Sequence, residues 1–383
     1  MVSARLSPFG STVFTTITAR ARETGAIDLG QGYPSWEGPD FVKRAAVAAI
    51  LEASNQYPPS MGVPELRQAI ADRWRLDTGA EIDPVANVTV TSGCTEALAA
   101  TFLGTFDPGD RIVVFEPAYD AYPVGCALAG AQPDYVTLHH PHFEFDPSAV
   151  RSALEAGARA ILVNTPHNPT GKVFTIEEMK FIADMAIEYD ALVITDEVYE
   201  RMVYEGEHIR MATLPGMWER TITLSSIGKS FSLTGWKTGW AIAPEHLTSA
   251  VRAAHQFLTF TTPNPMQLGA AAALRAPAEY YEELSAGYAA KRNKLTDGLG
   301  EVGFGVVAPQ GAYYVLADHT SFGFPDDLAF VDHLITDVGV AAIPPSYFYH
   351  VSEEGRRLVR FAFCKDDDTL DAALVRLQKL RRP

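Results

Sequence analysis

Between about residues 45 and 280, the sequence alternates short β-rich runs with segments long enough to form helices. The runs are Val88–Thr91, Ile112–Phe115, Ala160–Val163, Leu192–Thr195, Thr221–Leu224 and Gly239–Ala243. Because they are largely apolar and are separated by helical segments such as Thr95–Phe106, they predict a mostly parallel sheet with helices on both faces. Ligands bind such sheets beyond the carboxyl ends of the strands, so we expect the functional residues to follow the runs.

A different pattern begins near residue 281. A long charged helix, predicted at about Tyr281–Glu301, leads to strand-like runs at Gly311–Ala317 and Leu358–Phe363, each followed by a predicted helix. This mixture predicts a smaller α+β domain, and 383 residues are enough for two domains. The expected division is an N-terminal arm that packs with the small domain (1–44), a large α/β domain (45–280) and a small C-terminal domain (281–383).

Charge and cysteine usage narrow the class of protein. The chain has 31 Lys and Arg against 47 Asp and Glu, a formal net charge of -16. An acidic surface repels nucleic acids and anionic membranes, so we expect neither as a partner. The three cysteines have no Cys-x-x-Cys spacing and the first residues lack the apolar core of a signal peptide, which favours the cytoplasm. The run His139–His142 has no cysteine or carboxylate at ligand spacing, so we expect no metal site.

The first candidate catalytic residue is Lys229, which follows the run Thr221–Leu224 among small and hydroxyl residues. A lysine held away from bulk water loses its proton more readily and can then react with an aldehyde. Ser226 and Lys237 lie on either side of Lys229 and are suited to binding a phosphate. A surface loop with two solvated lysines is the alternative, and this segment alone does not decide between them.

Asp196 follows another apolar run, Leu192–Thr195. A carboxylate in this place is either a helix N-cap or a catalytic group. A cofactor such as pyridoxal phosphate needs a carboxylate beside its ring nitrogen, because the protonated ring accepts electrons. Tyr199 comes three residues later, where its hydroxyl is suited to contacting the phenolate oxygen of such a cofactor.

Two further runs end in turns that suit ligand binding. Asn164–Gly171 has two prolines and a glycine, which force a turn that projects Asn168 as a neutral donor. The segment Thr91–Ala97 passes through Gly93 into a predicted helix, whose first N–H groups favour an anion such as phosphate. Neither pattern is specific alone, and the second is neither a Walker A loop nor Gly-x-Gly-x-x-Gly.

Together, in this order, these segments resemble the class I aminotransferases, especially the branch of kynurenine/glutamine aminotransferases and bacterial N-succinyldiaminopimelate aminotransferases. The resemblance extends from about Phe14 to Lys365. It is most specific between Ser225 and Trp240, which match Ser-Ser-x-x-Lys-x-Phe-x-x-Thr-Gly-Trp-Lys-x-Gly-Trp. It implies the aspartate-aminotransferase fold, with pyridoxal phosphate held by Lys229 as a Schiff base.

The resemblance also implies roles for single residues. Lys229 resembles the lysine that carries the cofactor and moves the substrate proton, and Asp196 the partner of the ring nitrogen. Tyr199 and Asn168 resemble donors to the phenolate oxygen, and Asn168 also lies on the substrate side. The remaining implied cofactor contacts are Gly93, Cys94 (through its backbone), Thr95, Ser226 and Lys237 at the phosphate and Tyr119 on the ring. Position 237 is Arg in some relatives.

On the substrate side, Arg360 resembles the arginine that binds the α-carboxylate, and Gly32 the glycine whose backbone closes over that carboxylate. Phe14 lies where relatives have an aromatic residue of the side-chain pocket. Tyr57 resembles a residue that reaches the phosphate of the neighbouring subunit, which implies a homodimer with sites at the subunit interface. A buried core position is the alternative for such aromatic residues.

The implied reaction moves an amino group between an L-amino acid and a 2-oxo acid. No arginine for a distal carboxylate is identifiable, and Phe14, Tyr33 and Phe257–Phe260 suggest an aromatic pocket. The donors that fit are kynurenine, glutamine, methionine, aromatic amino acids or N-succinyldiaminopimelate. β-Elimination, γ-replacement or cyclisation would use the same residues and stay open as alternatives. A non-catalytic relative would need a change at Lys229, Asp196 or Arg360, and none is present.

Overall fold

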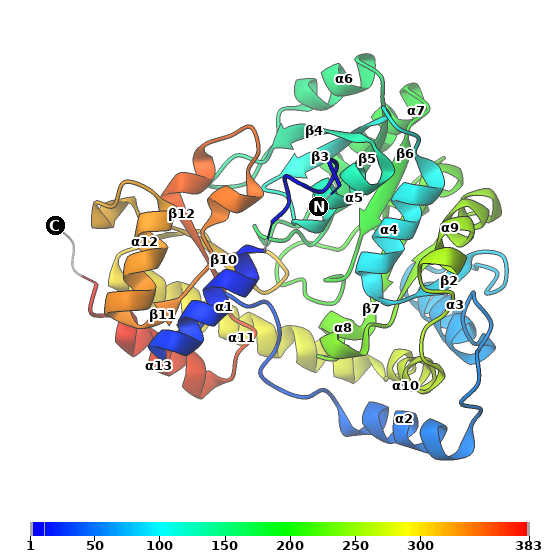
Figure 1. Cartoon of the computed structure of the whole chain (residues 1–383), viewed down its shortest axis with the longest axis horizontal. Helices are drawn as coiled ribbons and strands as arrows, with labels where there is room; N and C mark the ends of the chain where they lie inside the picture. The colour runs from blue at the N-terminus through cyan, green and yellow to red at the C-terminus, as the bar shows by residue number, and fades with distance from the viewer. Residues whose placement is uncertain (1–2, 11, 381–383) are drawn as a thin grey trace.

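The computed structural model describes residues 3–10 and 12–380. Its largest element is a seven-stranded sheet flanked by helices (Figure 1). Its strands are β2 (Val88–Thr91), β3 (Arg111–Glu116), β4 (Gln132–Thr137), β5 (Ala158–Asn164), β6 (Leu192–Asp196), β7 (Thr221–Ser226) and β8 (Gly239–Ile242). They lie in the order β2-β8-β7-β6-β5-β3-β4, and β8 is antiparallel to both neighbours while the other pairs are parallel. The predicted mostly parallel sheet is therefore confirmed, and all six predicted runs form strands.

Strand β4 was not predicted. It reads Gln-Pro-Asp-Tyr-Val-Thr, and only Val136 in it is fully buried. It is an edge strand that pairs with β3 alone, so it has no continuous apolar run and tolerates a proline.

Helices cover both faces of the sheet. The helices of this part are α2 (Asp40–Glu52), α3 (Pro64–Thr78), α4 (Gly93–Thr105), α5 (Ala121–Ala129), α6 (Pro147–Glu155), α7 (Ile176–Glu188), α8 (Ile227–Ser230), α9 (Glu245–Leu258) and α10 (Asn264–Leu274). Along β3, Ile112 and Val114 pack into the core with α4, α5 and α9, whereas Val113 and Phe115 pack with α6 and α7 on the opposite face. This alternation is what a strand buried on both faces requires.

The C-terminal residues form a second core, which includes Val13, Ile17 and Ala21 of the first helix. Figure 1 shows this first helix beside the C-terminal elements. The elements are α1 (Val13–Thr24), β1 (Ile27–Asp28), α11 (Ala278–Val302), β9 (Gly305–Val306), β10 (Tyr314–Asp318), α12 (Asp327–His333), β11 (Val340–Ala341), β12 (Leu358–Ala362) and α13 (Asp367–Leu377). The expected boundaries at 44/45 and 280/281 lie inside α2 and α11, and the division into domains stays a prediction.

The short strand β1 pairs in parallel with β11, which joins the N-terminal arm to the C-terminal elements through backbone hydrogen bonds.

Among the described residues, no helix combines the length and hydrophobicity that a bilayer-spanning segment requires.

Candidate active site

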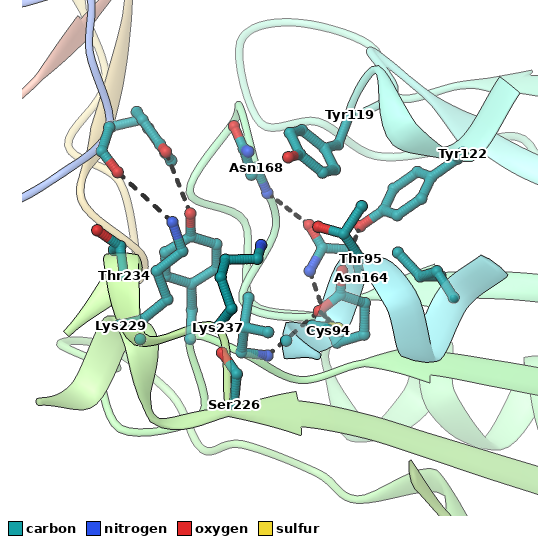
Figure 2. Close-up of a pocket in the computed structure, with 18 of the residues that line it drawn as sticks. Cys94, Thr95, Tyr119, Tyr122, Asn164, Asn168, Ser226, Lys229, Thr234 and Lys237 are labelled. Atoms are coloured by element: carbon teal, nitrogen blue, oxygen red, sulfur yellow. Dashed lines mark hydrogen bonds between the residues drawn. The ribbon is translucent and has the colours of Figure 1, made fainter. Parts of the chain in front are cut away.

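A cavity of about 230 Å³ lies where β5, β6 and β7 end, beside the start of α4 (Figure 2). Of the residues predicted from the sequence, it is lined by Phe14, Gly32, Gly93, Cys94, Thr95, Tyr119, Asn168, Asp196, Tyr199, Ser226, Lys229 and Lys237. Arg360 and Tyr57 are not among its lining residues. Side chains far apart in the sequence thus meet at the carboxyl edge of the sheet, while their roles stay predictions.

Lys229 lies on α8, the short helix that follows β7. Its Nζ donates to the backbone oxygen of Gly32 at 3.5 Å and lies 5.5 Å from the ring centres of Tyr199 and Tyr313. Burial among these groups lowers the pKa of Lys229 from 10.5 to about 8. Lys229 is therefore not a solvated surface lysine, and a large fraction of its amine is neutral near pH 8.

Asp196 is the last residue of β6 and does not cap a helix. Its carboxylate is buried and accepts hydrogen bonds from the Tyr122 hydroxyl (3.0 Å), the Cys94 thiol (3.6 Å) and the Val198 backbone N–H (3.3 Å). Burial raises the pKa of Asp196, and these donors offset part of the rise because they stabilise the ionised form. The result is an oriented acid that faces the cavity.

Asn164 connects Asp196 to Asn168, and the sequence did not single it out. Its Nδ2 donates to the backbone oxygen of Asp196 at 2.8 Å, and its Oδ1 accepts from the backbone N–H of Asn168 at 2.7 Å. The end of β6 and the turn that carries Asn168 are therefore held together by one buried amide. The available signal was its position as the first polar residue after the run Ala160–Val163.

The start of α4 forms a cradle suited to an anion. Gly93 has a φ of +77°, and a Cβ added there would lie 3.2 Å from the Nζ of Lys237. Glycine therefore leaves room for the ammonium group beside the first N–H groups of a helix, where anions bind. Ser226 and Thr95 add hydroxyls to the same cavity.

Burial raises the pKa of the Cys94 thiol well above its usual value, so this residue is a poor nucleophile.

Tyrosine hydroxyls fill the side of the cavity near Gly32. The Tyr199 and Tyr314 hydroxyl oxygens lie 3.1 Å apart, and the Tyr313 hydroxyl donates to the Gly32 oxygen at 2.6 Å. A Cβ at Gly32 would overlap the Tyr314 hydroxyl, so only glycine allows this close approach. The sequence predicted Tyr314 only as part of a strand and did not predict Tyr122, because a single tyrosine in a strand or helix carries no local signal of function.

Arg360, on β12, lies behind this wall and is only 1% exposed. Its guanidinium donates to Asn168 Oδ1 at 3.1 Å and to the Gly30 oxygen at 2.8 Å, and it lies 4.3 Å from the ring centre of Tyr314. Its buried Nε has no acceptor among the described residues. A buried guanidinium with an unused donor is suited to binding a carboxylate.

Tyr57 lies on the surface and is 85% exposed. It makes an edge contact with Phe260, with ring centres 5.6 Å apart. Within one chain, the residue is therefore far more exposed than a cofactor ligand would be.

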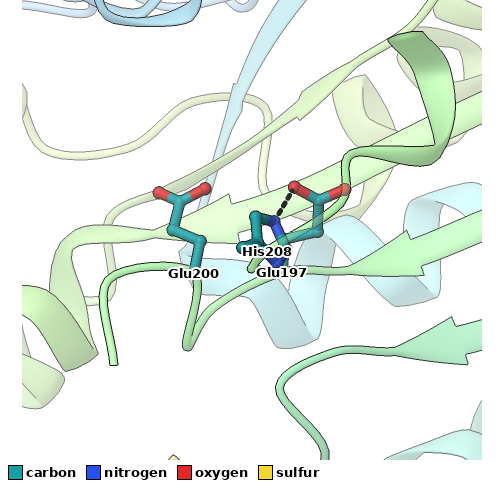
Figure 3. Close-up of side chains that lie close together, drawn as sticks. All are labelled: Glu197, Glu200 and His208. Carbon is teal, nitrogen blue, oxygen red and sulfur yellow. Dashed lines mark hydrogen bonds and ion pairs between the residues drawn. The ribbon is translucent and has the colours of Figure 1, made fainter. Parts of the chain in front are cut away.

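One group of side chains among the described residues has metal-ligand geometry, namely Glu197, Glu200 and His208 (Figure 3). Arg210 already binds both carboxylates, at 2.7 Å from Glu197 and 2.8 Å from Glu200. Burial acts to raise the pKa of Glu197, but the charges of His208 and Arg210 bring it below its usual value. The cluster is thus an ion-pair network whose cation is an arginine. His139, in the histidine run considered above, pairs instead with Glu354 at 2.7 Å.

The donor set of the cavity fits pyridoxal phosphate. Lys229 supplies an amine that deprotonates readily, and Asp196 an oriented acid for the ring nitrogen. Gly93 and Lys237 form the anion cradle, and Tyr119 supplies an aromatic face in the same cavity. An aldehyde, a pyridine ring and a phosphate each find a chemically matched partner.

Comparisons with known proteins agree with this chemistry. A family model described as "Aminotransferase class I and II" matches residues 24–377. A Mycobacterium tuberculosis protein named as a probable N-succinyldiaminopimelate aminotransferase is 42% identical over 391 aligned residues, covering 99% of this chain and 98% of that protein. A kynurenine--oxoglutarate transaminase of Dictyostelium discoideum is 36% identical, with 99% and 96% covered. The solved structure of N-succinyldiaminopimelate aminotransferase from Mycobacterium tuberculosis has a TM-score of 0.96, 43% identity and 100% coverage of both chains. The chain therefore belongs to the class I and II aminotransferases, which are pyridoxal-phosphate enzymes.

Proposed function

We propose that this cavity is the catalytic site and that Lys229 binds pyridoxal phosphate in it. The observation that carries the proposal is that an amine with a pKa of about 8 and the buried acid Asp196 face one cavity. The anion cradle of Gly93 and Lys237 lines the same cavity. A perturbed pKa together with a charged partner in one cavity is typical of functional sites.

In the proposed reaction, pyridoxal phosphate supplies the reactive aldehyde and a ring that accepts electrons. The neutral Nζ of Lys229 would take the proton from the substrate Cα. Asp196 holds a proton on the ring nitrogen, and Tyr122 and Cys94 keep its carboxylate oriented. Tyr199 and Asn168 are the proposed donors to the phenolate oxygen.

Arg360 and Gly32 are the proposed site for the α-carboxylate of the substrate. A guanidinium that holds both carboxylate oxygens fixes which Cα bond faces the ring, and this orientation decides which bond breaks. The free Nε donor of Arg360 supports the proposal, as does its contact with Asn168 in the cavity wall. The ring centre of Phe14 lies 5.1 Å from the Arg360 carbon Cζ, so the proposed side-chain pocket would lie next to the proposed carboxylate site.

The proposed donor is a large amino acid of the kynurenine, glutamine, methionine, aromatic or N-succinyldiaminopimelate type. Support comes from the aromatic walls Phe14, Tyr119 and Tyr314, and from the names of the two relatives described above. The described lining residues include no arginine for a distal carboxylate. Because those relatives are named as aminotransferases, β-elimination, γ-replacement and cyclisation are not favoured.

We also propose that the enzyme is a homodimer. Apolar side chains are exposed in two segments that meet where the rings of Tyr57 and Phe260 make an edge contact, and a partner subunit would cover them. These exposed side chains are Val47, Ile50, Leu51, Tyr57, Phe257 and Phe260. Tyr57 is the residue proposed to reach the partner's phosphate. Light scattering of the purified protein tests this, and a monomer at micromolar concentration would contradict it.

A cytoplasmic location is the last part of the proposal. It is supported by the three cysteines, all of which are described and none of which forms a disulfide. Fractionation of cells that produce the protein, with immunodetection of each fraction, tests the location.

The function is tested by spectroscopy and by a substrate panel. The purified protein with pyridoxal phosphate is expected to show a visible absorption band that shifts when an amino donor is added. Lys229→Ala is expected to lose the band and the turnover together, since no amine remains to bind the aldehyde. A panel of amino donors with one 2-oxo acid then ranks the donors. A wild-type protein that stays colourless, or a Lys229→Ala variant that still turns over, would contradict the proposal.

A further inference from the structure

We propose that Tyr314 is a positioning residue with two separable effects: its hydroxyl directs the proton of Tyr199, and its ring supports Arg360. The inference rests on the proposed function, since it concerns the same cavity. Tyr314 begins β10, and its side chain is 3% exposed. It contacts both the proposed cofactor donor, Tyr199, and the proposed carboxylate ligand, Arg360.

The effect of the hydroxyl follows from counting protons. A tyrosine hydroxyl has one proton to donate and lone pairs to accept with. The oxygens of Tyr199 and Tyr314 lie 3.1 Å apart, so one of them donates to the other. If the Tyr199 hydroxyl donates its hydrogen bond to the phenolate oxygen of the cofactor, its own oxygen can accept a hydrogen bond from the Tyr314 hydroxyl. A donor to the Tyr199 oxygen makes Tyr199 a stronger donor in turn, because hydrogen bonds in a chain polarise one another.

The effect of the ring follows from its position against the guanidinium. The Arg360 carbon Cζ lies 4.3 Å from the centre of the Tyr314 ring, nearer than the rings of Phe14 (5.1 Å) or Phe348 (5.2 Å). A cation over an aromatic face is stabilised, most strongly when water is excluded. The ring therefore supports the guanidinium of Arg360, whose buried Nε has no hydrogen-bond partner among the described residues.

Gly32 completes the arrangement, because its missing side chain lets the backbone lie directly against the Tyr314 hydroxyl. The backbone at Gly32, which is proposed to close over the carboxylate, therefore packs against Tyr314, the residue proposed to position both Tyr199 and Arg360. The position of Tyr314 is therefore defined from three sides, by Tyr199, Arg360 and Gly32.

The first test is Tyr314→Phe, which removes the hydroxyl and keeps the ring. When the phenolate oxygen of the cofactor receives weaker hydrogen bonds, it carries more negative charge. It then attracts the proton on the Lys229 nitrogen more strongly, so this proton is lost at a higher pH. The midpoint of the pH titration of the cofactor band is then expected to rise by roughly half to one pH unit. The charged and titratable groups around Lys229 (Asp196, Lys237, Arg360 and Cys364) are unchanged in this variant.

Tyr280→Phe is the matched control. It also removes one hydroxyl hydrogen bond near Lys229, from Tyr280 to the backbone oxygen of Ser230 at 2.9 Å, but it leaves Tyr199 untouched. Its titration midpoint is expected to equal that of the wild type. An equal midpoint for Tyr314→Phe and the wild type, or an equal shift in Tyr280→Phe, would overturn the effect assigned to the hydroxyl.

The second test is Tyr314→Leu, compared with Tyr314→Phe. Loss of the ring is expected to raise KM for the amino donor by about tenfold over that of Tyr314→Phe. The dissociation constant of a substrate analogue that has the carboxylate but no amine is expected to rise with it. A thermal unfolding curve checks that the variant is folded, and Tyr314→Phe keeps the proposal testable if it is not. An unchanged KM in folded Tyr314→Leu overturns the effect assigned to the ring.

These outcomes are distinct from failure of the proposed function. A wild-type protein that never develops a cofactor band contradicts the catalytic site itself. A wild-type protein with a band and turnover, but with variants that behave like it, contradicts only the inference about Tyr314.

Discussion

The hydroxyl of Tyr122 donates to Oδ2 of Asp196 at 3.0 Å, inside the wall of the cavity. Tyr122 lies in α5 and Asp196 ends β6, so a helix on one face of the sheet supports an acid at its edge. Both residues are almost fully buried. A buried carboxylate without donors would take up a proton, and this contact opposes that change.

Tyr122→Phe is therefore expected to raise the pKa of Asp196 still further above its usual range. An acid that is protonated more often binds the cofactor ring less well, and the dissociation constant for pyridoxal phosphate should rise about tenfold, as for loss of a hydrogen bond to a charged group. Fluorescence titration of the apoenzyme measures this constant. Tyr135→Phe, whose ring stacks on His350 instead, is the control and should bind like the wild type. Equal affinity in all three proteins would show that the contact is only structural.

The pKa of Lys229 gives a prediction about pH. Because this pKa is lowered from 10.5 to about 8, the neutral amine forms between pH 7 and 9, well below the range of an ordinary lysine. The rate at which the apoenzyme binds pyridoxal phosphate should rise through about pH 8 and level off above it. Stopped-flow absorbance at a series of pH values measures the profile. A rate that keeps climbing toward pH 10.5 would mean that the amine is solvated.

Gly93→Ala tests the anion cradle. The new methyl group would lie 3.2 Å from Lys237 Nζ and would occupy a backbone with φ of +77°, so the ammonium group has to move away. The dissociation constant for pyridoxal phosphate is expected to rise by about tenfold or more, while that for pyridoxal, which lacks the phosphate, changes little.

Gly79→Ala is the control for the backbone effect. Gly79 has a similar φ of +74°, but a Cβ there would meet nothing within 4 Å. Both variants lose about 1 kcal/mol of folding stability from the left-handed backbone. Only Gly93→Ala should lose affinity for the phosphate, and a loss in both would assign the effect to stability.

How far the sequence predicted this site depends on where each residue lies along the chain. Lys229, Asp196 and Asn168 all follow apolar runs, and the carboxyl ends of parallel strands meet at one edge. Their convergence could therefore be predicted from local patterns together with one topological rule. Another local pattern marks the start of α7, where Thr175 is followed by Glu178 and the two side chains accept hydrogen bonds from each other's backbone N–H groups, as in a capping box.

The enclosure of Arg360 was not predictable in this way. Its hydrogen-bond partner Asn168 is 192 residues away, and its aromatic neighbours Phe14, Tyr314 and Phe348 come from three separate segments. No local pattern specifies such contacts, because they arise when the N-terminal arm and the C-terminal elements pack on the sheet. Tyr122 was missed for another reason, since a single tyrosine in a helix carries no local signal of function. Asn164 did carry a signal, as the first polar residue after the run Ala160–Val163.

The ion-pair network behind Asp196 gives the last prediction. Arg210 binds Glu197, which is fully buried, and also Glu200, and its own side chain is 10% exposed. Arg210→Met would leave the buried carboxylate of Glu197 with fewer positive partners, which is expected to lower the free energy of unfolding by about 3–5 kcal/mol.

Arg159→Met is the control. It removes an exposed ion pair to Asp110 and should lower the free energy of unfolding by less than about 1 kcal/mol. Urea denaturation measures both differences, and a chelator should leave the wild-type curve unchanged because the cation of this network is an arginine. Equal costs for the two variants would mean that Glu197 is neutral and the network carries no charge pairing.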